Sequence, residues 1–584
     1  GVYVEFGDWD TAVSSAVTND GLVDVLVDAF ASGDELARAT ASGIGIGQEY
    51  ENVDGASATV VNDGDITVGV TATAIAAGDA LADSDEGTFG IFQDVDVDMA
   101  AGLAASAEAS NAGTMTVSNA MTASAQTGGV LADSGARGFQ QYVRGGADNL
   151  ASATNLGTAS VSASAIASIG EGTYAAAFSD AVGIGQTVLG TDAAPFSLSA
   201  SAAADNQGSL SVSAMASATG TYVEDSPGAF AVAQGIRQTA YDAGALSAMA
   251  SNTGSLSVVA DATADFEAGT YVSAASFAVG VSQNLDNREE VAGSAVASFT
   301  NEGSVTVQAT SSNTLDYAAF APSYAIAGGA GQSIFDVDSA DIDFENGASG
   351  TISVAADSAS DASLAVSAAI AIGVVQSADT EREGATADLT ATNLGILTVD
   401  SMARADGTYL AAASGYAIGI SQEADANGAT ILATNSGTLS VSAQAMASVV
   451  TGDFDGPEYA IAYNTYVGGI RQTANGDAIG SAMASNDGTI SVVAGATASA
   501  GTYAAAGSMS FGVLQQASGL DASTTFDNSG VVSVAGSTAA KSDNLAIAFV
   551  GARGVIQDVD GDGEADTTTS AVAEIINDDT IFGS

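Results

Sequence analysis

Residues 206–252 read NQGSLSVSAMASATGTYVEDSPGAFAVAQGIRQTAYDAGALSAMASN, and the stretch ends on the same kind of Asn with which it begins. Directly after the first Asn-x-Gly, Leu210 and Val212 alternate with Ser211 and Ser213. A period of two places side chains on one face of a β-strand, not of a helix. The runs AFAVAQGIRQ and ALSAMASN alternate in the same way. The stretch therefore predicts three strands of about 8–10 residues joined by turns.

One part of this stretch, a Gly-apolar-x-Gln tetrapeptide, recurs along the whole chain with a mean spacing of about 46 residues. Alanine is a good helix former, but the alternation with Ser, Thr and Val and the frequent Gly favour strands. The glutamines of the twelve copies are Gln48, Gln93, Gln141, Gln186, Gln238, Gln283, Gln332, Gln376, Gln422, Gln472, Gln515 and Gln557.

A second landmark, Asn-x-Gly-x-apolar-x-Val, runs in step with the first. Looser copies start at Asn155, Asn346 and Asn393, and a shortened copy, NDDTIF, starts at Asn577. Two landmarks that recur in a fixed order are typical of a repeat protein. The asparagines to which we assign a repeated structural role are Asn19, Asn62, Asn111, Asn155, Asn206, Asn252, Asn301, Asn435, Asn486 and Asn528.

Units of this size cannot bury an apolar face alone, but stacked units build a continuous core. We therefore expect an all-β fold, a parallel β-solenoid of about twelve units of ~46 residues with three strands each. Residues 1–584 would form one continuous domain, with a partial unit over 1–18, twelve repeats over 19–576 and a partial unit over 577–584. The pattern leaves open the handedness and whether one unit winds once or twice.

The repeated Gln and Asn residues have a structural interpretation. Gln238 lies two residues after Ile236 and so shares its inward face. A buried amide needs partners, and stacked copies supply them, so we expect a ladder of Gln side chains in the core. The turn Asn tolerates the left-handed backbone conformation and can form a second ladder. Ligand contact or catalysis is the alternative role for both sets.

The composition leaves little room for enzyme chemistry. The chain has no His and no Cys, and Lys541 is its only lysine. Imidazole or thiolate metal sites, disulfides and triads with a His base are therefore excluded. No pattern selects a pair of carboxylates for glycoside hydrolysis. We predict that the protein is not an enzyme.

Charge and hydropathy restrict the possible binding partners and the cellular location of the protein. The 69 acidic and 10 basic residues give a formal net charge of −59, which repels nucleic acid and anionic membrane surfaces. No stretch reaches the ~18–20 apolar residues of a membrane helix, so no membrane span is expected. The sequence begins at Gly1 without a basic leader, as a processed, exported protein would. We expect an extracellular or cell-surface location.

The sharpest chemical motif is DVDGDGEAD at residues 558–566. Its alternating carboxylates, with a glycine for the tight turn, have the spacing of a calcium loop. These residues resemble the loop of thrombospondin type 3 and dockerin repeats, although Thr569 stands where an EF-hand has a bidentate Glu. An acidic loop without metal is the alternative. The expected ligands of a Ca²⁺ ion are Asp558, Asp560, Asp562 and Asp566.

The two ends of the chain look complementary. The opening GVYVEFGDWD is in phase with GVIQDVDGDGE of the last repeat, and the closing NDDTIFGS starts a strand after an Asn turn. Uncapped solenoid ends expose unpaired strand edges, so two copies would complete each other head to tail and form a filament. The residues expected at this polymer interface are Gly1, Val2, Tyr3, Val4, Phe6, Asn577, Ile581 and Phe582.

The string GIRQTAYDAGALSAMASNTGSLSVVA, at residues 235–260, resembles curlin repeats in its inward Gln, turn Asn and apolar alternation. By its overall pattern the chain is also similar to Ala/Gly-rich β-solenoid surface proteins, such as autotransporter passengers and filamentous haemagglutinin-like adhesins. These resemblances imply an exported bacterial surface or matrix protein, with amyloid-like backbone pairing in the curlin case.

Our functional hypothesis is a structural subunit of an extracellular filament, in a biofilm matrix or a surface fibre, that polymerises head to tail by strand completion. The partner would be a second copy of the chain, with lateral packing through Ser, Ala and Gly outer faces once charge is screened. The alternative is a calcium-dependent surface adhesin or surface-layer protein that acts as a rod. A third class, ice- or carbohydrate-binding solenoids, needs regular outward ranks, and the outward position before each repeated Gln is too mixed.

Overall fold

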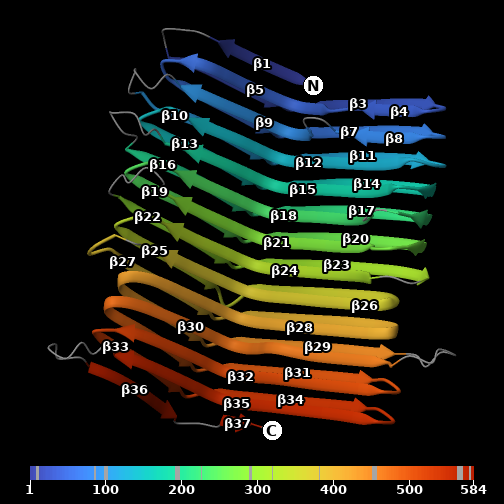
Figure 1. The fold of residues 1–584 in the computed structure, drawn as a ribbon. Helices are drawn as coiled ribbons and strands as arrows, with labels where there is room; N and C mark the ends of the chain where they lie inside the picture. Colours follow the sequence, from blue (N-terminus) through green and yellow to red (C-terminus); the bar gives the residue numbers. More distant parts are fainter. Residues whose placement is uncertain are drawn as a thin grey trace.

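The computed structural model describes most of the chain. The described residues are 1–7, 12–84, 87–97, 103–190, 198–224, 227–287, 293–317, 320–380, 382–449, 457–561, 570–577 and 581–583. Within them the regular elements are β-strands, which together form one sheet of 37 strands. All the strand pairs are parallel and stack along one axis, with the N-terminus at one end and the C-terminus at the other (Figure 1). The predicted all-β, parallel, solenoid-like fold is confirmed.

Each strand pairs with strands about one repeat earlier and later in the chain. Gln186, for example, is aligned with Gln238, and Gln238 with Gln283. Because the repeats stack in this register, residues at equivalent positions form columns that run the length of the molecule. We name three columns of strands by the residues that mark them.

The Asn column contains the strands that end at a turn Asn. Its members are β2 (Val13–Asn19), β6 (Ala56–Asn62), β10 (Ala105–Asn111), β13 (Asp148–Asn155), β16 (Ser199–Asn206), β19 (Ala245–Asn252), β22 (Ser294–Asn301), β25 (Ser339–Asn346), β27 (Thr386–Asn393), β33 (Asp521–Asn528) and β36 (Ser570–Asn577). Along this column the turn Asn of each repeat is aligned with the turn Asn of the next repeat, which fixes the register of the turns.

The Ser column follows the Asn-x-Gly turn and is rich in outward Ser and Thr. Its separate strands are β3 (Leu22–Gly33), β7 (Asp65–Ala76), β11 (Thr114–Ala125), β14 (Thr158–Gly172), β17 (Ser209–Val223), β20 (Ser255–Gly269), β23 (Ser304–Tyr317), β29 (Thr438–Val449), β31 (Thr489–Ser499), β34 (Val531–Lys541) and β37 (Ile581–Gly583). Two short strands, β4 (Leu36–Thr40) and β8 (Asp79–Asp83), follow the first two Ser-column strands, but they stack in line with residues 130–133 and so belong to the start of the Gln column.

The Gln column carries the repeated glutamines. Its separate strands are β1 (Val2–Gly7), β5 (Gly43–Val53), β9 (Thr88–Val97), β12 (Gly129–Arg144), β15 (Tyr174–Leu189), β18 (Gly228–Tyr241), β21 (Ser273–Asp286), β24 (Phe320–Phe335), β32 (Tyr503–Gly519) and β35 (Leu545–Gly561). Three long strands pass from one column into the next without a break: β26 (Thr351–Asp379), β28 (Ile396–Asn435) and β30 (Tyr459–Asn486).

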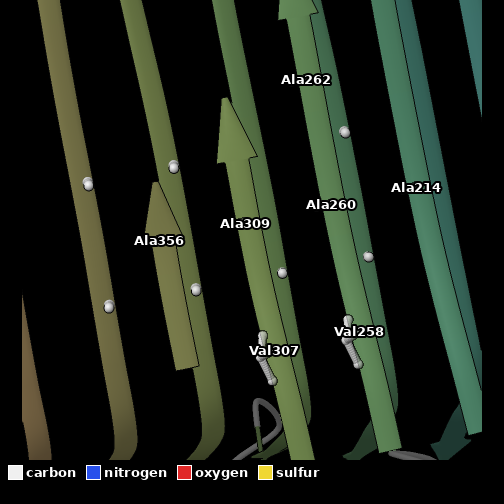
Figure 2. Close-up of a cluster of buried hydrophobic side chains, with 14 of the residues drawn as sticks. Ala214, Val258, Ala260, Ala262, Val307, Ala309 and Ala356 are labelled. Atoms are coloured by element: carbon white, nitrogen blue, oxygen red, sulfur yellow. The ribbon is translucent and has the colours of Figure 1, made fainter. Parts of the chain in front are cut away.

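The core between the columns is built from small side chains in register. On the Ser column, Val258 is aligned with Val307 and Ala260 with Ala309, and all four side chains are buried (Figure 2). Small inward residues let the facing strands approach closely over the whole length, which fits an aromatic content of only 6%. The sheet therefore packs as a thin, continuous core with few large side chains.

A glycine three residues before each repeated Gln marks a bend in the Gln column. At this point the alternation of inward and outward side chains fails, since Gly235 and Ile236 are both buried. A Cβ atom on Gly235 would lie 2.4 Å from the carbonyl oxygen of Gly280 and 2.8 Å from Cδ1 of Leu256. The next member, Gly280, would come within 2.5 Å of the carbonyl oxygen of Gly329. Glycine is needed here for close approach, and the bend divides each Gln-column strand into two halves.

Candidate functional site: the amide ladders and the open ends

The twelve repeated glutamines form one continuous ladder of side-chain hydrogen bonds. From Gln93 to Gln557, each Nε2 donates to the Oε1 of the Gln one repeat earlier, at 2.7–3.1 Å. From Gln48 to Gln515 the side chains are at most 1% exposed. The structure thus brings together all the glutamines that the sequence pattern singled out, on the inner side of the Gln column.

The same glutamines tie the Gln column to the Asn column across the core. Nε2 of Gln238 also donates to the backbone oxygen of Met249 at 2.9 Å. On either side of the ladder lie two separate hydrophobic clusters, one containing Ile236 and the other containing Ala240 and Leu246. The Gln ladder therefore runs as a polar spine between two apolar cores, and it fixes the separation of the two columns.

The turn asparagines form a second ladder. From Asn19 to Asn486, each Nδ2 donates to the Oδ1 of the Asn one repeat later, at 2.6–2.8 Å, and the last acceptor among the side chains that the structure describes is Asn528. The looser copies at Asn346 and Asn393 take part in it like the others. The Asn donors point toward the C-terminal end and the Gln donors toward the N-terminal end, so the dipoles of the two ladders oppose each other.

The expected left-handed backbone of the turn Asn is wrong. Among the described non-glycine residues, only Asn52, Asp242 and Asp336 have a positive φ, and none of them belongs to the Asn ladder. The ladder asparagines end an extended strand, and the turn is held instead by backbone hydrogen bonds between repeats. For example, the N–H groups of Gln207 and Gly208 both donate to the backbone oxygen of Asn155.

The N-terminal end of the Gln ladder is closed within the chain. Nε2 of Gln48 donates to the hydroxyl of Ser15 at 2.6 Å, and the position aligned with Gln48 on the first strand is Val4. The next inward aromatic, Tyr50, is fully buried and stacks on Phe6 with ring centroids 5.4 Å apart. Val4 and Phe6 thus cover the end of the ladder with apolar side chains.

The N-terminal edge of the sheet is open and apolar. Among the described pairings, β1, β2, β3 and β4 each pair with one later strand and have no partner on the other side. Gly1 is exposed, Val2 and Tyr3 are 41% and 49% exposed, and Val4 and Phe6 are half-buried. All five residues of the predicted interface at this end therefore lie on the edge strand β1 or just before it.

The edge strand β3 adds a second exposed group to this end. Its outward Leu22, Leu26 and Phe30 are 66%, 74% and 68% exposed. The inward valines of β3 are half-buried because no strand covers them, whereas the inward residues at the aligned positions of β7 are fully buried. An edge with inward and outward apolar side chains both exposed is a template for pairing with another chain.

The C-terminal edge is open in the same way. Among the described pairings, β35 pairs with β32, β36 with β33 and β37 with β34 on one side only. Asn577 ends β36 in line with Asn528, while Ile581 and Phe582 lie in β37 beside Val532 and Ser533. The predicted interface residues at this end therefore lie on edge strands.

The predicted calcium loop is only partly within the described residues. Asp558 and Asp560 follow Gln557 on the outer side of β35, are exposed, and help to line a cavity of about 160 Å³ with Asn475 and Ser518. Asp562 and Asp566 lie outside the described residues. Among those that are described, no group of three or more acidic side chains is placed to hold a metal ion. Calcium binding stays a prediction.

Sequence reasoning missed a third set of buried polar groups. Ser134 and Ser179 occupy the inward position seven residues before Gln141 and Gln186. Their hydroxyls donate to backbone oxygens of the facing Ser column, Ser134 to Asn119 at 3.0 Å and Ser179 to Ala163 at 2.9 Å. A Ser at an inward position of an otherwise Ala/Val run is the signal that could have found them.

Among the described carboxyl groups, Asp94 has the pKa that its surroundings shift most. It lies on the outer side of β9, where burial raises its pKa to about 6, the cation of Arg144 opposes this shift, and Glu49 adds to it. Nη2 of Arg144 is 4.0 Å from Oδ2 of Asp94. Burial also raises the pKa of several other carboxyl groups on the rod: Asp133, Asp261, Asp341, Asp357 and Asp425.

The raised pKa of Asp94 predicts greater stability in mild acid. A carboxyl group whose pKa is higher in the folded state than its unfolded value of roughly 3.9 gains protons on folding between those two values. Its stabilising contribution is therefore full below the lower value and is lost as pH rises through about 6. We expect the thermal midpoint of unfolding to rise when the pH is lowered from 7 to 5. The rise should be smaller in Asp94→Asn than in the unaltered protein. Equal shifts in both proteins would contradict this assignment.

None of the described segments forms a helix long and apolar enough to cross a membrane. Comparison with known protein families, characterised proteins and solved structures finds no match for the chain. The function is therefore argued from the ladders and the two open ends.

Proposed function

We propose that the protein is a structural, non-enzymatic subunit of an extracellular filament, in a biofilm matrix or a surface fibre, that assembles head to tail. The observation that carries this proposal is the pair of open sheet edges, each with apolar side chains exposed. We take each repeat as one coil of three strands, with twelve repeats over 19–576 and partial units over 1–18 and 577–584. The resemblance to curlin repeats and to β-solenoid surface proteins supports the same role by pattern.

The register of the open edges fits such a junction. In a stack of two copies, β2 would lie on β36, so that Asn19 continues the Asn ladder beyond Asn577. β1 would lie on β35, with Val4 over Gln557, so the Gln ladder stops at each junction. Parallel pairing of backbones supplies the affinity, and the Asn ladder sets the register.

The charges at the two ends favour the same orientation. The outward side of β3 carries Asp24 and Asp28, whereas Lys541 ends β34 and Arg553 lies on β35, both next to the C-terminal edge. In a chain with only 10 basic residues, two of them on the last coil lower the repulsion between unlike ends. Two N-terminal ends would instead bring these acids together, so head-to-tail contact is preferred over head-to-head contact.

Electron microscopy of the purified protein tests this function. We expect long uniform fibres from the full chain, and separate short rods from Val25→Asp. Val25 points inward on edge strand β3 and is half-buried, so an aspartate there keeps some access to water in a free rod but is fully buried without a partner in a junction. Asp24→Asn, on the outer side of the same strand, is the matched control and should form fibres. Short rods from the unaltered chain would contradict stacking and leave the alternative, a calcium-dependent adhesin or surface-layer rod.

The same grids test the role proposed for calcium. Fibres that persist with a chelator would show that Ca²⁺ is not required for assembly. Fibres formed only with Ca²⁺, and lost in Asp558→Asn/Asp560→Asn, would make the acidic motif at residues 558–566 the switch. Circular dichroism of each variant separates failure to assemble from failure to fold.

A further inference from the structure

The outer side of the Gln column, from the start of each strand to the bend, is an apolar face of unusual length. We call it the aromatic face. It consists of the outward side chains of nine successive stacked segments, which are residues 174–182, 228–234, 273–279, 320–328, 364–372, 410–418, 459–468, 503–511 and 545–553.

This face is nearly free of charge in a highly charged protein. Its nine segments contain only two residues that are charged at neutral pH, Asp180 at the N-terminal end and Arg553 at the C-terminal end, although the chain has 69 acidic and 10 basic residues. Large apolar side chains on it are well exposed, among them Phe230 at 37%, Tyr324 at 41% and Met509 at 49%. By contrast, the outer side of the Ser column consists mainly of Ser and Thr.

The aromatic side chains form contiguous rows rather than isolated patches. The rings of Phe178 and Phe230 lie 6.4 Å apart, and those of Phe230 and Phe277 lie 5.2 Å apart. Farther along the rod, the rings of Tyr466 and Phe511 lie 4.6 Å apart. A continuous apolar surface that runs over many coils exceeds what a soluble monomer ordinarily exposes, and it indicates an interaction surface.

The size of the face suits a stable protein interface. Nine strands stacked at about 4.8 Å give a length of roughly 40 Å, and even the shortest segments, which are seven residues long, give a width of about 20 Å. The area is then roughly 800 Å² on each partner, which is the amount that standard stable complexes bury. Two such sheets can pack face to face at about 10 Å, as in a β-sandwich.

The two charges on the face are arranged to suit a second copy that runs in the opposite direction. Arg553 is exposed, and among the described residues no ion pair involves it. At the other end, Asp180 lines a cavity of about 290 Å³ together with Asp83 and Asp133, and Arg137 is the single cation there. An antiparallel arrangement sets Arg553 of each copy against this acidic cavity of the other.

We propose that the aromatic face is the docking surface for a second copy of this chain, packed face to face with the two rods antiparallel. A two-fold axis passes through the middle segment 364–372, so β26 packs on β26 and β15 packs against β35. The centre of the contact is then aliphatic, with Val366, Ile370 and Ile372, and aromatic rows lie on both sides of it.

A second copy fits better than the other apolar-binding partners. Sugar sites combine rings with convergent polar groups that bind hydroxyls, and the middle of this face offers almost none. Two copies with a net charge of −59 each repel one another over the rest of their surfaces, so an uncharged face of matching shape is where they can approach. This lateral contact does not depend on the end-to-end stacking proposed above.

Disulfide trapping tests the arrangement, because the chain has no cysteine of its own. Ile370→Cys lies next to the two-fold axis, and mild oxidation should convert most of it to a covalent dimer. β26 lies in the middle of the rod, so end-to-end stacking cannot bring two copies of this position together. Phe230→Cys and Met509→Cys should each form few dimers alone and should cross-link to each other when mixed, because β18 faces β32 in the antiparallel pair.

Met215→Cys is the matched control, since Met215 is 41% exposed on the outer side of the Ser column. It should stay monomeric under the same oxidation. Dimers of Phe230→Cys alone, as abundant as those of the mixture, would overturn the antiparallel arrangement. No dimer from Ile370→Cys, or binding of the unaltered protein to phosphatidylcholine vesicles or to dextran without dimerisation, would overturn the proposal and assign the face to a membrane or a glycan. Arg553→Glu should weaken the dimer and leave the fold intact.

Discussion

Replacing Gly254 with alanine is expected to lower the free energy of unfolding by about 3 kcal/mol or more, because the added methyl group has no room. Its Cβ atom would lie 1.9 Å from the carbonyl oxygen of Gly208 and 2.7 Å from the backbone of Gln207. These are backbone atoms of the neighbouring turn, so no side-chain rotation relieves the contact. The φ of Gly254 is not positive, so the cost arises from close approach and not from backbone conformation.

Urea denaturation followed by circular dichroism measures this effect, and hydrogen exchange shows where it acts. Repeat proteins transmit stability mainly between neighbours, so the loss of protection should centre on the turns at Gly208, Gly254 and Gly303. Gly495→Ala is the matched control, since its Cβ would meet only Cγ of Gln444 at 3.9 Å. That change in an open strand position should raise stability by about 0.5–1 kcal/mol. Similar results for the two variants would show that the turns are not closely stacked.

Replacing Gln283 with leucine is expected to lower the free energy of unfolding by about 3–5 kcal/mol, because it removes one hydrogen bond from each of the two neighbouring buried amide groups of the ladder. Nε2 of Gln283 donates to Oε1 of Gln238 at 2.8 Å, and its own Oε1 accepts from Nε2 of Gln332 at 2.8 Å. Leucine has a similar volume, so the loss comes from the buried Oε1 of Gln238 and the N–H of Gln332 that lose their Gln283 partner, more than from packing. The backbone oxygens of Ala248 and Ser298 also lose a donor.

Gln308→Leu is the control for this change. Gln308 lies exposed on the outer side of β23, and its side chain makes one weak contact with Thr310 at 3.4 Å. We expect the free energy of unfolding of Gln308→Leu to remain within about 0.5 kcal/mol of that of the unaltered protein, as for most surface substitutions. If Gln283→Leu were as mild as Gln308→Leu, the Gln ladder would not be what holds the Gln column to the Asn column.

Much of the fold could be predicted from the sequence because the pattern is local and repeated. Alternation after each Asn-x-Gly identifies strands, and the constant spacing of Gln and Asn fixes which residues meet when units stack. The inward position of Gln238 and its partnership with Gln186 and Gln283 follow from these two facts. The sequence also shows that every copy of the tetrapeptide begins with glycine, but it does not show that the close approach of the next repeat requires it.

Other features depend on atoms that the pattern does not bring together. The direction in which each ladder donates, the hydroxyl of Ser15 that closes the Gln ladder, and the extended backbone at the turn Asn are all set by packing across the core. Filament assembly, calcium binding and an extracellular location remain predictions from the sequence, with tests stated above.

By itself the sequence determined that this chain is a stack of β-strands with amide ladders inside, because period-two alternation and a fixed repeat length act through backbone geometry alone. Only the tertiary structure decided which outward residues become neighbours. Phe178 and Phe230 each lie eight residues before their glutamines but Phe277 lies six before its own, so no single repeat shows that the three rings share a row. They form a surface because parallel pairing places each strand about 4.8 Å from the next, whatever the length of the loops between them.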